Sequence, residues 1–156
     1  MQTVYFIDTS ILLNILDVPK RNQEREKIVQ KMERMISEGD GFILPLATII
    51  ETGNHIAHID DGNQRRDRAE LLSDLIRNVL NDNFPWVYNK NEIAGADLLK
   101  IAEKFPDYAQ KEEMGLGDLS ILTEYFRFKN KHKKRFNVKI WSTDGHLCAR
   151  DGTDRL

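Results

Sequence analysis

Four acidic side chains stand where a metal site could form. Asp8 and Asp144 each come directly after a short apolar run that is typical of a buried strand. Asp118 opens a helical pattern after a glycine-containing turn, and Glu51 lies within an earlier helical pattern. Carboxylate oxygens are the hard ligands that Mg²⁺ or Mn²⁺ prefers. Since like charges repel when they are brought together, four carboxylates in one crevice would need a cation among them.

Apolar runs and helical spacing predict the elements that position these acids. Strands are predicted at residues 4–7, 41–44, 86–88 and 138–141, and helices at residues 11–16, 21–38, 46–59, 71–80, 93–105 and from residue 118 onward. Strands that alternate with helices indicate parallel βαβ units. Asp8 and Asp144 are therefore expected at the carboxyl edge of one sheet, where open α/β sheets bind ligands.

Local residue types predict where two of the helices begin and end. Thr9 or Ser10 is expected to cap the helix that follows Asp8, because hydroxyl side chains satisfy free backbone N–H groups there. Pro106 is expected to end the preceding helix, because proline lacks an N–H group and clashes with the previous turn. Residues 107–117 would then form a loop.

Composition bounds the class of protein. The chain has 156 residues, of which 40% are hydrophobic, so we expect one domain with one well-buried core. We expect a cytoplasmic protein, because the chain has a single cysteine and no pattern of a secretory leader. We expect no membrane segment, because no apolar run approaches the roughly 20 residues that cross a bilayer. The net charge of -2 does not indicate a polyanion partner by itself.

The ordered set of acids resembles the PIN-domain nucleases, particularly the VapC-type ribonuclease toxins. The resemblance rests on Asp8 in FIDTS, Glu51 in an early helix, Asp118 in GLGDLSI and Asp144 in WSTD, and it spans nearly the whole chain. It implies a single three-layer α/β/α domain over residues 1–156 with a central, mainly parallel sheet of four to five strands. Residues 60–115 would form a longer helical segment than in a minimal toxin, and the family's final edge strand would be short or missing.

The resemblance also implies an activity, which is metal-dependent hydrolysis of RNA. Its catalytic residues and Mg²⁺ or Mn²⁺ ligands would be Asp8, Glu51, Asp118 and Asp144. The hydroxyls that orient a carboxylate or the substrate phosphate would be those of Thr9, Ser10 and Ser142. The implied partners are an RNA (tRNA, rRNA or mRNA), an antitoxin protein and a second copy of the chain in a homodimer.

Each acid also has a plain structural interpretation. Asp8, Asp118 or Asp144 alone could cap a helix or form a turn, and Glu51 alone could be an ordinary solvated helix residue. Two further functions stay open, a catalytically inactive module that binds RNA or protein and a stand-alone RNA-processing nuclease. A haloacid-dehalogenase-like phosphohydrolase is disfavoured, because Ser10 stands where those enzymes carry a second aspartate.

A basic run is the second feature that bears on function. Residues 127–139 hold seven basic side chains and no acid, between a predicted helix and the last predicted strand. Lys131, Lys133, Lys134 and Arg135 could contact an RNA backbone or a partner. Equally, cations at a helix end offset the helix dipole and could be only a solvated surface. The predicted topology places this run at the amino end of the strand, opposite the acids.

Overall fold

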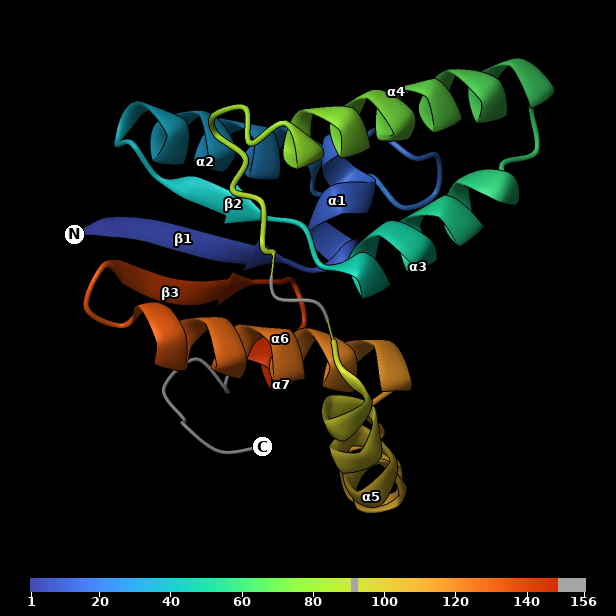
Figure 1. The fold of residues 1–156 in the computed structure, drawn as a ribbon. Coiled ribbons are helices and arrows are strands. Elements are labelled where there is room, and N and C mark those ends of the chain that lie inside the picture. Colours follow the sequence, from blue (N-terminus) through green and yellow to red (C-terminus); the bar gives the residue numbers. More distant parts are fainter. Residues whose placement is uncertain (91–92, 149–156) are drawn as a thin grey trace.

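The centre of the fold is a small parallel sheet. In this computed structural model, which describes residues 1–90 and 93–148, the strands are β1 (Gln2–Ile7), β2 (Gly41–Ile43) and β3 (Phe136–Trp141). They are ordered β2-β1-β3, and both pairings are parallel (Figure 1). Their carboxyl ends therefore meet at one edge, as predicted.

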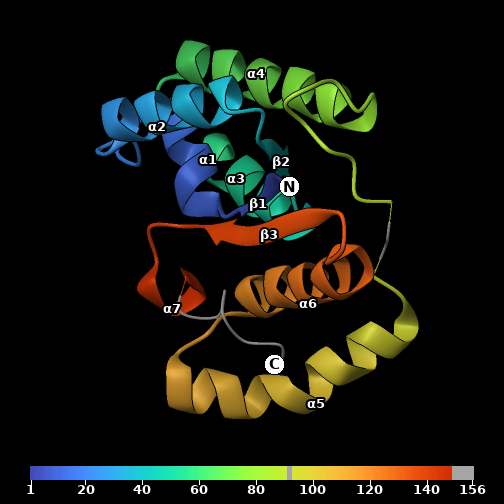
Figure 2. The same cartoon turned by 90° about the vertical axis from the view of Figure 1, so that its left-hand side faces the viewer.

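Helices cover both faces of this sheet. On one side lie α1 (Thr9–Ile15), α2 (Arg25–Ser37), α3 (Leu46–Ala57) and α4 (Gly62–Leu80), and on the other lie α5 (Gly95–Glu112), α6 (Leu116–His132) and α7 (Gly145–Cys148). Figure 2 shows that α6 packs next to the sheet and that α5 lies beyond it. Within the described ranges, no helix is long and apolar enough to cross a membrane.

The strands hold these layers together because both of their faces are apolar. Val4 and Phe6 are fully buried in the cluster that the sheet shares with α6. Ile7 and Trp141 belong to the other cluster, which the sheet shares with α1 to α4. Successive strand residues point to opposite faces, so an uninterrupted apolar run serves both layers. This confirms the α/β class and the parallel sheet that the sequence predicted.

The number of strands is smaller than predicted. The described residues contain three strands, where the sequence analysis expected four to five. The predicted strand at residues 86–88 forms only an isolated parallel bridge between Trp86 and Phe42, flanked by bonds from Phe42 N to Pro85 O at 2.9 Å and from Val87 N to Phe42 O at 2.8 Å. Because residues 86–88 pair with β2 at this one bridge, they do not form a strand of the sheet. The expected edge strand after residue 148 lies outside the described residues.

Several helix boundaries also differ from the predictions: α4 begins at Gly62 rather than at residue 71, and α2 begins at Arg25 rather than at residue 21. Pro106 lies inside α5, which continues to Glu112, so the loop expected at residues 107–117 is mostly helix. Phe105 and Tyr108, on either side of this proline, pack against the same core cluster, and these contacts carry the helix past the lost hydrogen bond. The N-cap of α1 is Asp8 rather than Thr9 or Ser10, and α6 begins at Leu116, ahead of Asp118.

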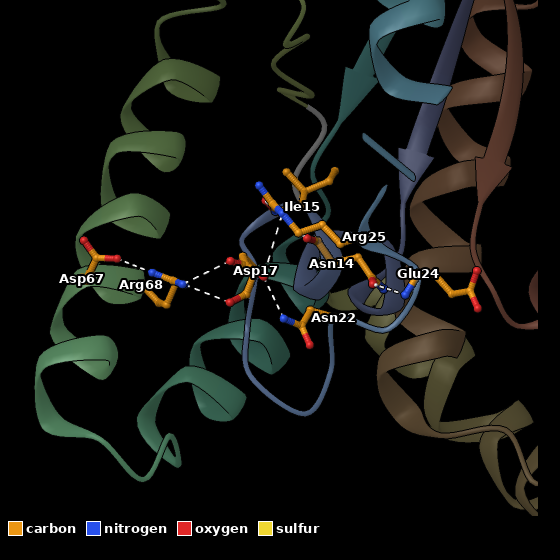
Figure 3. A network of polar contacts seen from close by, with 8 residues as sticks. All are labelled: Asn14, Ile15, Asp17, Asn22, Glu24, Arg25, Asp67 and Arg68. Atoms are coloured by element: carbon orange, nitrogen blue, oxygen red, sulfur yellow. Dashed lines mark hydrogen bonds and ion pairs between the residues drawn. The ribbon is translucent and has the colours of Figure 1, made fainter. Parts of the chain in front are cut away.

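A polar network fixes the connection between α1 and α2 against α4 (Figure 3). Asp17, whose φ is 55°, accepts a hydrogen bond from Asn22 Nδ2 at 2.7 Å, and Arg68 of α4 donates from Nε to Asp17 O at 2.9 Å. Arg25 donates to Asn14 O at 2.8 Å, and Asn14 Nδ2 donates to Ser10 O at 2.8 Å. The network thus holds the C-terminal end of α1 against α2 and α4, and the Asn14 side chain links that end to the backbone of Ser10 within the same helix.

Candidate acidic site at the carboxyl edge of the sheet

The register of β1 against β3 places Asp8 beside Ser142. Ile7 pairs with Trp141, and Asp8 N donates to Trp141 O at 3.0 Å. Ser142 Oγ then donates to Asp8 Oδ2 at 2.7 Å, and Ser10 Oγ donates to the same oxygen at 2.9 Å. Asp8 is only 5% exposed, and although it is the N-cap residue of α1, its side chain makes no capping hydrogen bond. Two hydroxyls therefore orient a buried carboxylate.

The same two hydroxyls fix the turn that carries Asp144. Thr143 N donates to Ser10 Oγ at 3.1 Å, and Asp144 N donates to Ser142 Oγ at 2.8 Å. Asp144 thus follows β3 in a turn whose backbone is bonded to the hydroxyls around Asp8. The structure brings together Asp8, Ser10, Ser142 and Asp144 as the sequence analysis proposed.

Glu51 reaches this edge from α3. Thr48, in the first turn of that helix, is fully buried and donates from Oγ1 to Ile7 O at 2.8 Å, which anchors α3 to the end of β1. Glu51 follows three residues later, on the same side of the helix. Thr9 Oγ1 donates to Glu51 Oε2 at 2.7 Å. Glu51 therefore faces the start of α1 rather than open solvent.

Asp118 reaches the edge from the first turn of α6, where a glycine permits a close approach. A Cβ added at Gly117 would lie 1.8 Å from Glu51 Oε1, so only a residue without a side chain allows Glu51 to take this position. Asp118 follows directly and accepts a hydrogen bond from the backbone of Gly115. The position of the Glu51 carboxylate against α6 thus depends on Gly117.

The four acids lie within range of one another's charge. Burial, which is the largest cause, and the negative charges of Asp8, Glu51 and Asp144 together raise the pKa of Asp118 to about 6, although the Gly115 hydrogen bond lowers it. All three charged groups that act on Asp118 are acids. This is the electrostatic pattern of a site that favours a cation.

The oxygens are nonetheless spread apart. Within the parts of the chain that the structure describes, no three His, Cys, Asp or Glu side chains form a group that could hold a metal ion. Asp8, Glu51 and Asp118 are instead bonded to separate hydroxyl or backbone donors, as mutually repelling carboxylates would be. The donor set fits Mg²⁺ or Mn²⁺ by its chemistry, and binding would require the side chains to turn toward a common centre.

An apolar pocket adjoins this site. Its volume is about 730 Å³, and Glu51 and Gly117 lie on its wall, as does Glu124 of α6. Burial raises the pKa of Glu124 to about 7. The sequence analysis missed Gly117, Thr48 and Glu124. For Gly117, the available signal was a residue without a side chain directly before Asp118. For Glu124, the signal was an acid within a helix that was predicted to be buried over much of its circumference.

The basic run lies away from the acids. Lys131 is in the last turn of α6, and Lys133, Lys134 and Arg135 are exposed in the connection to β3. Cζ of Arg135 lies 4.9 Å from the centre of the Phe136 ring. Because this connection precedes β3, it is at the opposite end of the strand from Asp144, as the sequence predicted (Figure 1).

Comparison with known proteins adds no relative to this description. No family model, curated protein or solved structure matches the chain.

The raised pKa of Asp118 gives a testable titration. In the metal-free protein, we expect Asp118 to titrate near pH 6, and replacing Asp8 by Asn should lower that pKa because one neighbouring negative charge is removed. The folded protein then holds the proton more tightly than the unfolded chain. Ionisation of Asp118 should therefore reduce the free energy of unfolding as the pH rises from about 4 to about 6.

Carboxyl ¹³C NMR of the metal-free protein measures this titration directly. The matched control is Asp74→Asn, at an exposed position on α4 where the carboxylate pairs with Arg77. It should leave the Asp118 titration unchanged. An Asp118 pKa near the ordinary value of 3.8, or one that ignores Asp8→Asn, would contradict the described electrostatics.

Proposed function

We propose that this protein is a metal-dependent endoribonuclease of the PIN type. The single observation that carries the proposal is the gathering of Asp8, Glu51, Asp118 and Asp144 within electrostatic range at the carboxyl edge of a parallel sheet. Such an edge is the usual ligand site of open α/β sheets. The site combines the buried carboxylate of Asp8 and three partly buried carboxylates with hydroxyl donors, and the proposed chemistry requires neither a nucleophilic serine nor a histidine.

The proposed roles follow from the contacts of each side chain. Ser10 and Ser142 both bond to Asp8 Oδ2, and they would hold this carboxylate in place as it binds a cation. Thr9 holds Glu51 in the same way through Oε2. The chemistry that a divalent ion supplies in such a site is a lowered pKa for water and neutralisation of charge on the scissile phosphate. Asp118 would bind as its ionised form, which the positive charge favours.

The wider PIN-like assignment belongs to the same proposal. The bridge at Trp86 lies beside β2, where a fourth strand would extend the sheet. Within this proposal, RNA is the substrate, and the exposed basic connection before β3 holds a longer RNA at a distance from the cleaved bond. An antitoxin and a homodimer are the partners expected if the protein is a toxin, whereas a stand-alone RNA-processing nuclease would need neither.

One observation favours a second candidate, a catalytically inactive module that binds RNA or protein. The spread carboxylate oxygens form no ready metal group among the described residues. Such a module would retain RNA without cleaving it at any metal concentration. The buried, hydroxyl-bonded Asp8 favours the nuclease, because a carboxylate that only caps a helix has no need of Ser10 and Ser142 as donors.

Cleavage assays separate these two functions. We expect RNA cleavage with Mn²⁺ or Mg²⁺ and none with EDTA. Asp8→Asn and Asp118→Asn should each reduce the rate at least about 100-fold, because each removes charge from the centre of the site. The substrates are tRNA, ribosomal RNA and single-stranded oligonucleotides. Asp74→Asn is the control and should keep full activity. Metal-independent cleavage, or full activity in both active-site variants, would overturn the nuclease assignment.

Gly117 provides a sharper test, because its substitution moves one catalytic carboxylate without removing it. In Gly117→Ala the new Cβ would displace the Glu51 carboxylate, so cleavage should fall by roughly 100-fold. The fold should persist, because the displaced atom is the end of a flexible side chain and alanine favours a helix.

The matched control is Gly115→Ala, where an added Cβ meets nothing within 4 Å. This position is the N-cap of α6, so the control should lose about 1 kcal/mol of stability but retain cleavage. Thermal unfolding is measured alongside the cleavage rate. Equal activity in both variants would show that Glu51 takes no part.

A further inference from the structure

The apolar pocket beside the acids is large enough for a small molecule. Its volume of about 730 Å³ lies between α3, α4, α5 and α6, with walls that include Ile50, Ile76, Leu98 and Ile101. Pockets of roughly 300–1,000 Å³ with apolar walls and a few polar groups are typical of small-molecule sites. Among the described residues that line the pocket, the charged side chains are two acids, Glu51 and Glu124.

Glu124 is the group in this pocket that lacks a partner. It is 9% exposed, and its Oε2 is buried with no hydrogen-bond partner among the described residues. Leaving a buried carboxylate oxygen unpaired is unfavourable. Arg127 lowers the pKa of Glu124, yet its effect is smaller than that of burial, and Arg127 donates to Asp97 Oδ2 at 2.8 Å. The carboxylate therefore remains available to a ligand.

Charge and shape together define the ligand. Glu51 already accepts a hydrogen bond from Thr9 and belongs to the acidic site, whereas Glu124 has no assigned role there. An apolar body would cover the leucine and isoleucine walls, and one positive nitrogen would satisfy the buried carboxylate. An anionic ligand would be repelled, and a neutral one could donate a hydrogen bond to Glu124 but would leave its negative charge unbalanced.

We propose that this pocket binds an organic monocation, an amine on an apolar body whose ammonium group pairs with Glu124. The inference is independent of the nuclease assignment, since it uses neither the metal nor RNA. The apolar part contributes through its contact with the pocket walls, and the ammonium group decides which ligands are selected.

The test compares three ligands that share one apolar body and differ in charge. They are 4-phenylbutylamine, 4-phenylbutanol and 4-phenylbutyrate, added at pH 8 with EDTA and without RNA. At this pH Glu124 is mostly ionised and an amine is still protonated. Methyl NMR of labelled isoleucine and leucine reports binding. We expect shifts at Ile50, Ile76 and Leu98, none at Ile28 of α2, and an affinity for the amine at least 10-fold above that for the alcohol.

Variants then assign the selectivity to one carboxylate. Glu124→Gln keeps the size of the side chain and should reduce the preference for the amine to near unity. Glu103→Gln, an exposed α5 position outside the pocket, should leave the preference unchanged. The methyl spectrum of each variant reports whether it is folded, and the comparison of ligands in the native chain needs no variant.

Three results would overturn the proposal. The first is equal affinity for the amine and the alcohol in the native chain. The second is the absence of methyl shifts with millimolar amine. The third is a set of pocket methyl shifts that follow protein concentration without any amine, which would show that a second copy of the chain occupies the pocket. Loss of RNA cleavage in the assays above would not affect the outcome, because the binding measurement requires no activity.

Discussion

Parallel pairing of β1 with β3 is the constraint on which the acidic site depends. The pairing runs through six residue pairs and ends at Ile7 and Trp141, so Asp8 and Ser142 leave the sheet side by side. A shift of one residue would turn each side chain to the opposite face of the sheet and separate the carboxylate from its hydroxyl donor. Burial of both strand faces against helices makes such a shift costly. The core thus determines the geometry of the site.

Electrostatic repulsion is the second constraint, and it is local. Four acids meet at one edge of the sheet. The effect of their charges is seen at Asp118, whose pKa is raised by burial and by the other three acids. Hydroxyl and backbone donors stabilise the individual carboxylates, but such bonds do not cancel the repulsion between them. A cation would. The unbalanced negative charge therefore accounts for the separation of the oxygens and, after burial, for part of the raised pKa of Asp118.

The sequence predicted the parts of the site that follow from strand ends. An apolar run followed by an acid locates Asp8 and Asp144 at the sheet edge, because parallel strands end together. Hydroxyls next to those acids are close to them by covalent connection and register, which is why Ser10 and Ser142 could be named. The position of Glu51 was harder to predict, because its orientation depends on the hydrogen bond by which Thr48 fixes α3 to the end of β1.

Long-range packing explains what the sequence could not predict. Proline ends many helices, yet here the contacts of Phe105 and Tyr108 with the core continue α5 past Pro106. The apolar segment at Trp86 resembles a strand locally but meets β2 at a single bridge. The contact between Gly117 and Glu51 joins two helices that are distant in sequence, so no local pattern encodes it.

The most direct test of the central claim is anomalous diffraction from crystals soaked in Mn²⁺. We predict a strong anomalous peak between Asp8 and Asp118, with carboxylate oxygens of Glu51 or Asp144 turned toward it and with the peak absent in Asp8→Asn. A well-ordered crystal of the native chain that shows no peak there at millimolar Mn²⁺, with the four side chains still bonded only to their separate donors, would contradict the account.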